Sequence, residues 1–417
     1  MSPEVTAAVI AASVSVLTLI GTLVAQYFGR RATSRDTQEA LEEQRKQLNR
    51  TLAEQRTRTL NERFATAAEQ LGSDKPAIRL AGVYAMAGLA DDWDENRQTC
   101  VDVLCAYLRM PYEPDPGPGV AEPERLAFQA IREARHTVIR VATAHLKSDA
   151  AVSWQGLNFD FTGVVFDGGD FRDAQFSGGA VSFGGAHFSG GAISFGGAKF
   201  SGARVNFDGA QFSGGSASFR NAQFSAGTVS FNNAQFSGSS VSFSGAQFSQ
   251  RRRSARTPGA APYMSTVSFD DAEFSAGMVS FSGARISHST VGFSGAQFSG
   301  GMVSFGNAHF SGGTVYFGHA RLSRGTVDFS GARFSGGTVS FSGTEFFAGA
   351  VSFGNAQFSA GMVYFTGARF SGATVNFMKA QFSGGTVDFS GTKDWSFPPA
   401  FSWTDTPPRG VKLPKLA

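Results

Sequence analysis

The stretch from Gly178 to Gly202, GGAVSFGGAHFSGGAISFGGAKFSG, decides the fold because its phenylalanines recur at a fixed interval. They stand at positions 183, 188, 195 and 200, so the gaps alternate between five and seven residues. Almost only Gly, Ser, Ala and Val separate them. Self-similarity at a fixed period is the signature of a repeat architecture. We therefore expect one repetitive domain here.

The repeat extends far beyond this stretch. Phenylalanines from Phe161 to Phe176 are spaced strictly by five, and a 12-residue unit then runs six times to Phe248. The next gap, to Phe269, is the expected seven residues plus an insertion of fourteen, and ten further units lead to Phe389. The chain holds 51 Gly and 42 Phe in 417 residues without a Gly-X-Y period. This composition argues against both collagen and disorder.

Apolar residues at the centre of a five-residue interval and two positions before it are typical of pentapeptide repeats. Residues 157 to 392 resemble the pentapeptide-repeat proteins, most clearly in FTGVVFDGGDFRDAQFSGG at 161–179. The resemblance implies a right-handed parallel β-helix of square cross-section, with the central Phe and the preceding small residue pointing inward. Residues 77–109 also resemble the helical region of membrane-attached members from actinobacteria.

Two extra residues in every second unit depart from the family pattern. If one coil has four faces, with intervals of five and seven residues in alternation, the coil contains 24 residues. The alternative is that each 12-residue unit forms a whole coil. A 12-residue coil leaves too little interior for two phenyl rings, so we favour the 24-residue coil. Coils stacked about 4.8 Å apart would satisfy one another's backbone groups, and the rings would form a continuous core. Gly at the enlarged corners adopts backbone angles that other residues avoid.

The N-terminal segment predicts a membrane anchor over residues 1–32. No charged residue occurs from Val5 to Gly29. A helix of about 20 residues is long enough to cross a hydrocarbon core. Only Glu4 precedes the uncharged run, whereas Arg30 and Arg31 follow it. The positive-inside rule then places nearly all of the chain in the cytoplasm, attached to the plasma membrane by one span. A buried helix of a soluble domain is the alternative.

Residues 33–150 predict a helical stalk and cap. Up to about residue 72 the segment lacks Pro and carries a drifting leucine stripe. This pattern indicates a solvated helix or, alternatively, a weak homodimer. Helical periodicity continues over 77–109 and from about Glu122 to Lys147. The acidic stretch DDWDEN, residues 91–96, is interpreted as a solvated loop and not as a cation site. Cys100 and Cys105 are expected to be reduced thiols on a buried helix face.

The repeat shows no pattern of catalytic residues. Its serines occupy fixed outward positions, and the histidines His187, His309 and His319 have no carboxylate at matching positions. A nucleophile needs an oriented base beside it. No phosphate loop, zinc spacing or pair of catalytic acids occurs. We therefore expect a protein that is not an enzyme, with no cofactor, no metal and no small-molecule substrate.

Binding through the outer surface is the serious functional hypothesis. Residues 157–392 contain 11 Asp plus Glu and 14 Lys plus Arg, and this balance argues against the acidic DNA mimicry of some pentapeptide-repeat proteins. A 24-residue coil would stack the residues that precede alternate phenylalanines. A solvated ladder that maintains solubility is the first interpretation of these residues. The sharper hypothesis is a partner-binding stripe at Arg285, Arg321, Arg333 and Arg369.

Two irregular segments complete the expected domain plan. Within the β-helix at 151–392, a loop insertion at about 249–264 carries Arg251, Arg252 and Arg253. A tolerated surface loop is the first interpretation of this insertion, and contact of the arginines with an anionic partner, lipid headgroups or nucleic acid is the alternative. The tail at 393–417 is rich in Pro and Trp and would close the second end of the helix.

Together these features predict a membrane-tethered scaffold for protein–protein interaction at the cytoplasmic face. Its lipid contact would be the N-terminal helix, and its protein partner is unknown. A regulator of a nucleic-acid enzyme is the alternative, which the near-neutral rod disfavours.

Overall fold

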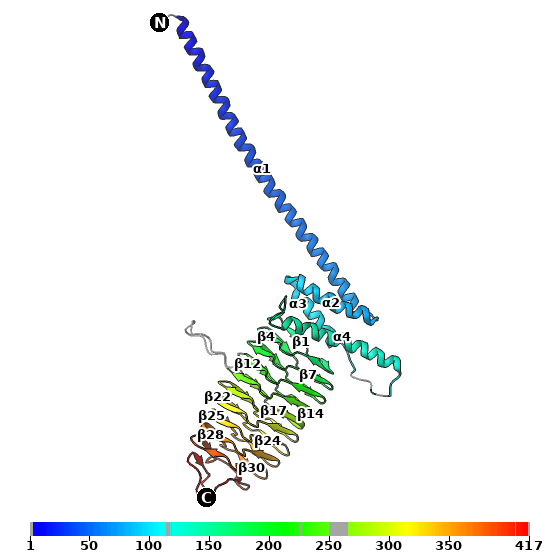
Figure 1. The fold of residues 1–417 in the computed structure, drawn as a ribbon, viewed down its shortest axis with the longest axis vertical. Helices are drawn as coiled ribbons and strands as arrows, with labels where there is room; N and C mark the ends of the chain where they lie inside the picture. The colour runs from blue at the N-terminus through cyan, green and yellow to red at the C-terminus, as the bar shows by residue number, and fades with distance from the viewer. Residues whose placement is uncertain are drawn as a thin grey trace. The chain divides into compact units, whose positions relative to one another are not determined.

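The computed structural model describes residues 3–113, 117, 119–225, 227–249, 266–404 and 406–415. The chain divides into two compact units, Met1–Ala65 and Thr66–Ala417. Each unit is described by itself. Helices α1 to α4 come first along the chain and are followed by strands β1 to β33 (Figure 1).

One helix, α1 (Pro3–Leu71), contains both the predicted anchor and the predicted stalk. From residue 10 to residue 27 its described side chains are exposed, including Leu17 and Ile20. The side chains of residues 3–9, 11 and 28–39 lie outside the described part of the chain. Among the described residues, no helix combines the length and the apolarity needed to cross a membrane. The structure therefore does not support the predicted anchor at 1–32.

Three further α-helices form the cap: α2 (Pro76–Asp92), α3 (Arg97–Arg109) and α4 (Glu122–Leu146). A 3₁₀ turn, η1 (Asp94–Asn96), joins α2 to α3. Pro lies near the first turn of α2 and of α4. This position suits Pro because the helix needs no backbone donor there. The predicted helical periodicity over 77–109 and from Glu122 is confirmed.

Within the described residues, 33 strands form two parallel sheets, which we call sheet A and sheet B. Sheet A consists of β1 (Phe159–Asp160), β4 (Gln175–Ser177), β5 (Ala180–Ser182), β8 (Lys199–Ser201), β9 (Arg204–Asn206), β12 (Gln223–Ser225), β13 (Thr228–Ser230), β15 (Gln247–Ser249), β16 (Thr266–Ser268), β18 (Arg285–Ser287), β19 (Thr290–Gly292), β22 (His309–Tyr316), β25 (Arg333–Ser340), β28 (Gln357–Tyr364), β31 (Gln381–Phe382), β32 (Thr386–Asp388) and β33 (Val411–Lys412). Sheet B consists of β2 (Val165–Phe166), β3 (Gly169–Asp170), β6 (His187–Phe188), β7 (Ala192–Ser194), β10 (Gln211–Phe212), β11 (Ser216–Ser218), β14 (Gln235–Ser242), β17 (Glu273–Ser280), β20 (Gln297–Phe298), β21 (Met302–Ser304), β23 (Arg321–Leu322), β24 (Thr326–Asp328), β26 (Glu345–Phe346), β27 (Ala350–Ser352), β29 (Arg369–Phe370) and β30 (Thr374–Asn376).

The strand register shows a 24-residue coil. Phe224 pairs with Phe248 in the next coil, and Val303 pairs with Val327. Across the insertion the offset grows by fourteen residues, since Thr228 pairs with Thr266. The 12-residue coil is thereby excluded and the prediction of a parallel β-helix is confirmed. Figure 1 shows these coils stacked one upon another from β1 to β30.

A tight turn recurs after the V-x-F segments, and its hydrogen bonds explain which residues the repeat carries at the turn positions. The N–H of the Ala three residues after the Phe donates to the carbonyl of that Phe, as Ala308 does to Phe305 at 2.9 Å. The residue before that Ala has a positive φ, which is 56° at Asn307. Such a φ favours Gly, Asn and Asp. The Ser, Asn or Asp before the Phe accepts the N–H two residues on, as Ser304 does from Gly306 at 3.2 Å. The repetitive serines are thus turn-forming residues.

The corner that contains the two extra residues of each 12-residue unit explains why the repeat carries paired glycines. Gly313 has a φ of 77°, and a Cβ on it would clash with the carbonyl oxygen of Ser289 in the coil below. Any side chain there would force the coils apart, so the close stacking of coils requires Gly at this corner.

The phenylalanine rings form the core. Phe305 is fully buried, and its ring centroid lies 4.8 Å from those of Phe281 and Phe329 in the adjacent coils. It also meets Phe293 and Phe317 edge-to-face, at 5.8 and 6.1 Å. Stacked and edge-to-face pairs are the preferred aromatic geometries. The predicted continuous aromatic core is confirmed.

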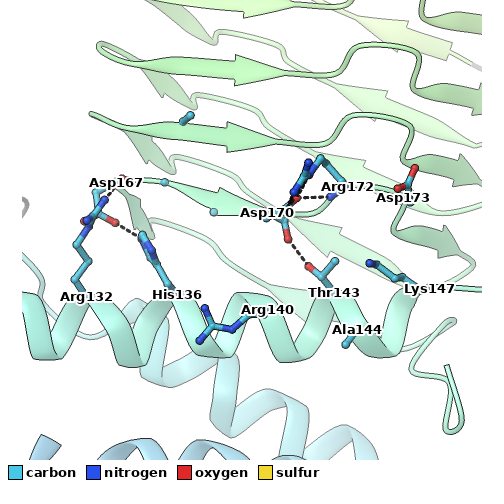
Figure 2. Close-up of a pocket in the computed structure, with 13 residues that line it drawn as sticks. Arg132, His136, Arg140, Thr143, Ala144, Lys147, Asp167, Asp170, Arg172 and Asp173 are labelled. Atoms are coloured by element: carbon cyan, nitrogen blue, oxygen red, sulfur yellow. Dashed lines mark hydrogen bonds and ion pairs between the residues drawn. The ribbon is translucent and has the colours of Figure 1, made fainter.

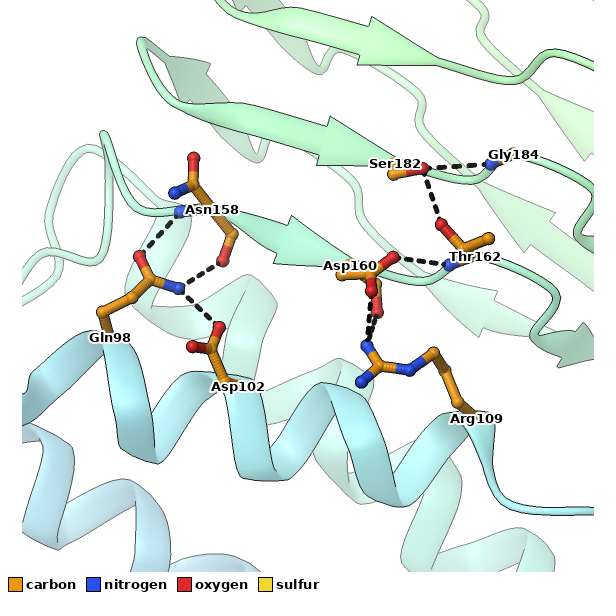
Figure 3. Close-up of polar contacts among 8 residues, drawn as sticks. All are labelled: Gln98, Asp102, Arg109, Asn158, Asp160, Thr162, Ser182 and Gly184. Atoms are coloured by element: carbon orange, nitrogen blue, oxygen red, sulfur yellow. Dashed lines mark hydrogen bonds and ion pairs between the residues drawn. The ribbon is translucent and has the colours of Figure 1, made fainter.

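Helix α3 covers the first edge of sheet A (Figure 3). The Gln98 amide donates to the carbonyl of Asn158 and accepts from its N–H, both at 2.9 Å. Arg109 donates to the carbonyl oxygen of Asp160 at 2.7 Å and to its carboxylate at 2.8 Å. An uncovered edge strand would expose unpaired backbone groups. These side chains satisfy some of those groups.

The C-terminal tail packs on the last coils. Trp395 meets Phe389 edge-to-face at 5.3 Å, and Trp403 meets Phe382 at 5.5 Å. Strand β33 extends sheet A by pairing Val411 with Val387. The tail therefore covers rings that the final coil would expose.

Candidate functional site

Basic and aromatic residues gather on one part of sheet A. A residue that precedes an inward Phe must point outward, because side chains alternate along a strand. The register then stacks Arg285 beside His309, His309 beside Arg333, and Arg333 beside Gln357. We call the outward surface of β18, β19, β22, β25 and β28 the cationic face.

The other ends of the same strands carry large apolar and aromatic side chains. Tyr316 on β22 is 43% exposed and Met362 on β28 is 47% exposed, and Tyr364 follows two residues later. We call the stacked residues Arg285, His309 and Arg333 the Arg column. Between this column and the other ends of the strands, the outward residues are Ser, Gly, Ala and Thr. The cationic face therefore has a basic column on one side of the Gly corner. On the other side of this corner lies a second column, in which Tyr316 and Tyr364 alternate with Gly292 and Ser340.

No acidic residue interrupts the cationic face. Its five strands contain no Asp, Glu or Lys. Arg285 and Arg333 are exposed, and in the described part of the chain neither guanidinium has an ion pair or hydrogen bond. His309 Nε2 contacts Ser335 Oγ at 2.9 Å. Two unpaired guanidinium groups two coils apart are thus available to an anionic partner.

The two other predicted arginines lie on sheet B. Arg321 pairs in register with Glu345, and Glu345 with Arg369. Arg321 Nε lies 3.1 Å from the Glu345 carboxylate, so opposite charges alternate in this column. The structure thus separates the four arginines into an unpaired set on sheet A and a partly neutralised set on sheet B.

The predicted residues Arg251, Arg252 and Arg253 lie outside the described residues. The segment that contains them starts after Ser249 on β15 and ends before Thr266 on β16. These strands pair directly with β18 and β19. The two strands that flank this segment therefore belong to the coil next to the cationic face.

A cleft of about 770 Å³ lies between α4 and the first coils (Figure 2). Its charged groups pair mostly with one another. Arg172 holds the Asp170 carboxylate at 2.6 Å, and Arg132 holds the Asp167 carboxylate at 2.8 Å. Gly169 has a φ of 151°, and a Cβ on it would lie 3.1 Å from Ile139. The cleft therefore reflects how α4 is seated on the solenoid.

The Asp167 carboxylate is the electrostatic centre of this junction. It accepts hydrogen bonds from Tyr112 at 2.7 Å and Arg132 at 2.8 Å, and it contacts His136 Nε2 at 2.9 Å. Burial alone would raise the pKa of Asp167, but these contacts outweigh it and hold the pKa well below its ordinary value. Asp167 thus joins α4 and the loop after α3 to the first coil.

Arg135 is a second buried link between α4 and the coils. It donates to the carbonyl oxygens of Leu108 and Val165, both at 2.8 Å, and stacks on the ring of Tyr112. Burial lowers the pKa of this guanidinium. Arg135 thereby satisfies a backbone acceptor at the end of α3 and another on β2.

The acidic stretch at the end of α2 and in η1 is only partly solvated. Asp92, Asp94 and Glu95 are exposed, as predicted, but Asp91 accepts from Trp154 Nε1 and contacts His145 Nε2, both at 3.0 Å. The prediction of a fully solvated loop is therefore wrong at Asp91. The reason is that α4 and the buried Trp154 approach it from distant parts of the sequence.

The cysteines are inert. Cys100 and Cys105 are free and buried on α3, as predicted. Burial raises the pKa of the Cys100 thiol to about 11 and that of the Cys105 thiol to about 12. Since the thiolate is the reactive form, neither residue is suited to nucleophilic chemistry.

The histidines of the repeat do not converge on one site. His187 lies on β6 and His309 on β22, whereas His288 and His319 have positive φ values of 53° and 57°. Within the described residues, no group of three or more His, Cys, Asp or Glu side chains is arranged to hold a metal ion.

Comparison with known families agrees with the geometry of the coils. Residues 178–222 and 293–345 match the family model "Pentapeptide repeats (9 copies)". The chain contains pentapeptide repeats. Both matched segments lie within the solenoid, and the cationic face overlaps the second one. A search of curated proteins and a search of solved structures found no match to the chain. Neither repeat segment includes residues 77–109, so their resemblance to membrane-attached actinobacterial members stays a prediction.

Sequence reasoning missed the aromatic half of the site and the junction residues. Tyr316 and Tyr364 occupy positions where the pentapeptide repeats elsewhere carry Ser, Asn or Asp, and this departure from the repeat is the signal that could have found them. Asp167 and Arg135 give no such signal, because their partners come from other elements.

Proposed function

We propose that this pentapeptide-repeat protein is a non-enzymatic scaffold that binds another protein through the cationic face. Pentapeptide-repeat proteins are often involved in protein interactions. The proposal adds to this the place on the solenoid where the partner binds.

The observation that carries the proposal is the composition of the cationic face. Protein interfaces are enriched in Arg, Tyr and Met and depleted in Lys, Glu and Asp. Exposed Arg285, Arg333, Tyr316 and Met362 lie on four of the five strands of the cationic face, and these strands contain no Asp, Glu or Lys. A surface whose task was solubility alone would mix charges of both signs, as the Arg321 column on sheet B does.

Reversing the charge of the cationic face tests the proposal. We expect the double substitution Arg285→Glu with Arg333→Glu to remove at least about nine-tenths of the partner captured by proximity labelling in the native cell. The reason is that two carboxylates would repel the anionic groups that the arginines attract. Both side chains are exposed, so we expect the thermal unfolding of the variant to match that of the unaltered chain.

The matched variant is Arg321→Glu with Arg369→Glu, which makes the same charge change on sheet B. Arg321 is already paired with Glu345, so we expect this variant to keep the partner. If only this variant loses the partner, the partner binds sheet B and not the cationic face. If both double variants capture the partner as the unaltered chain does, the four arginines have no role in binding.

Attachment of the scaffold to the plasma membrane through residues 1–32 is a second part of the proposal. It rests on the uncharged run from Val5 to Gly29 and on the exposed side chains of Ile10, Leu17, Leu19 and Leu23, and not on a membrane-spanning helix, which was not found among the described residues. We expect the full chain to float with liposomes and a chain without residues 1–32 to stay at the bottom of the gradient. Equal flotation of the two would contradict the attachment.

Regulation of a nucleic-acid enzyme by DNA mimicry remains the disfavoured alternative. A mimic needs a row of acidic groups, whereas the strands of the cationic face have none.

A further inference from the structure

We infer that the partner presents an amphipathic α-helix to the cationic face, with an acidic stripe and an apolar stripe side by side. The helix lies along the solenoid axis, across the strands. This inference rests on the proposed function and specifies the partner that the same face would bind.

The spacing of the basic column carries the inference. Arg285, His309 and Arg333 occupy three consecutive coils. Their strands therefore lie at steps of about 4.8 Å, and the two arginines lie about 9.6 Å apart. On an α-helix, residues i, i+3 or i+4, and i+7 share one face, at rises of about 5 and 10.5 Å. An acidic helix therefore places one carboxylate beside each of the three groups.

An extended acidic peptide fits the column less well. Its side chains return to the same face every two residues, about 6.7 Å apart, and every four residues, about 13 Å apart. Neither distance matches one or two coil steps, so an extended segment falls out of register with the column after its first contact.

The second column of the cationic face supplies the apolar half of the site. Tyr316 and Tyr364 lie in one column of sheet A with Gly292 and Ser340, and Met362 lies two residues before Tyr364 on β28. The outward Ser, Gly and Thr residues between the columns are small enough to let a helix approach. A helix with apolar residues beside its acidic stripe would cover both columns at once.

Synthetic helices can test this inference on the full-length chain. One 21-residue peptide carries Glu at i, i+4, i+7 and i+11 beside a stripe of Leu. A second peptide has the same composition and helicity, with Glu distributed around the helix. We expect the striped peptide to bind about tenfold more tightly in fluorescence anisotropy at about 0.15 M salt, because exposed ion pairs contribute modestly but add along a row.

Three results would overturn the inference: equal affinity of the two peptides, equal binding of the striped peptide to the Arg285→Glu, Arg333→Glu variant, or equally tight binding of an oligonucleotide of the same charge. The Arg321→Glu, Arg369→Glu variant should bind the striped peptide as the unaltered chain does. If the cationic face captures a protein in cells but no helical peptide in solution, the helix is refuted and the proposed function stands. If it captures neither, both are refuted.

Discussion

Replacing Phe305 with Ala should lower the free energy of unfolding of the solenoid by about 3–5 kcal/mol. The Phe305 ring is fully buried and contacts five other phenylalanine rings in its own and adjacent coils. Its removal leaves a cavity that closely stacked coils cannot close, because every coil is held by backbone hydrogen bonds to the next. Chemical denaturation followed by circular dichroism measures the change.

The chain offers a matched control for this substitution. The Phe347 side chain is 48% exposed at a corner. We therefore expect Phe347→Ala to change the free energy of unfolding by less than about 0.5 kcal/mol. Similar losses for the two variants would mean that the rings do not stabilise the fold by burial. Since each coil contacts only its neighbours, we also expect the damage from Phe305→Ala to concentrate near that coil in hydrogen exchange.

Replacing Asp167 with Asn should weaken the docking of the helical cap by about 2 kcal/mol. The neutral amide would leave Arg132 without its ion pair and would weaken the contacts of Tyr112 and His136. We expect faster amide exchange in α4 and over 165–170, with no change in the coils after residue 290. Asp328→Asn is the matched control. The Asp328 carboxylate accepts the N–H of Ser330 in its turn, and in the equivalent turn of an earlier repeat unit the Asn206 side chain accepts the N–H of Asp208 in the same way.

The effect of Asp167→Asn should depend on pH with a definite sign. The folded pKa of Asp167 lies below its ordinary value of 3.8. Its carboxylate therefore contributes fully above about pH 4, and this contribution is lost as the pH falls further toward the folded pKa. The difference in α4 exchange between the two chains should be largest above pH 4 and shrink below it. A difference that grows with acidity would contradict this account.

The site could be predicted from sequence only in part. The positions of Arg285, Arg333, Arg321 and Arg369 follow from the 24-residue period, because the register of a solenoid depends on residue number alone. The period does not tell whether a charge is neutralised. Glu345 pairs with Arg321 but no acid stands beside Arg333, and this difference makes sheet A the better surface. Tyr316 and Met362 lie in different columns, and they became part of the site only when the strands placed them on the same sheet.

By itself the sequence determined the solenoid, its coil length and its core, because each repeat specifies its own turn and contacts only the next repeat. The cap was decided by tertiary structure. Asp91 meets His145 and Trp154 across more than fifty residues, and Asp167 meets Tyr112 and Arg132 from two other segments. No local period encodes such pairs, since they form only when α4 and the first coil pack together. Local repetition therefore specifies the rod, and long-range packing specifies how its first end is closed.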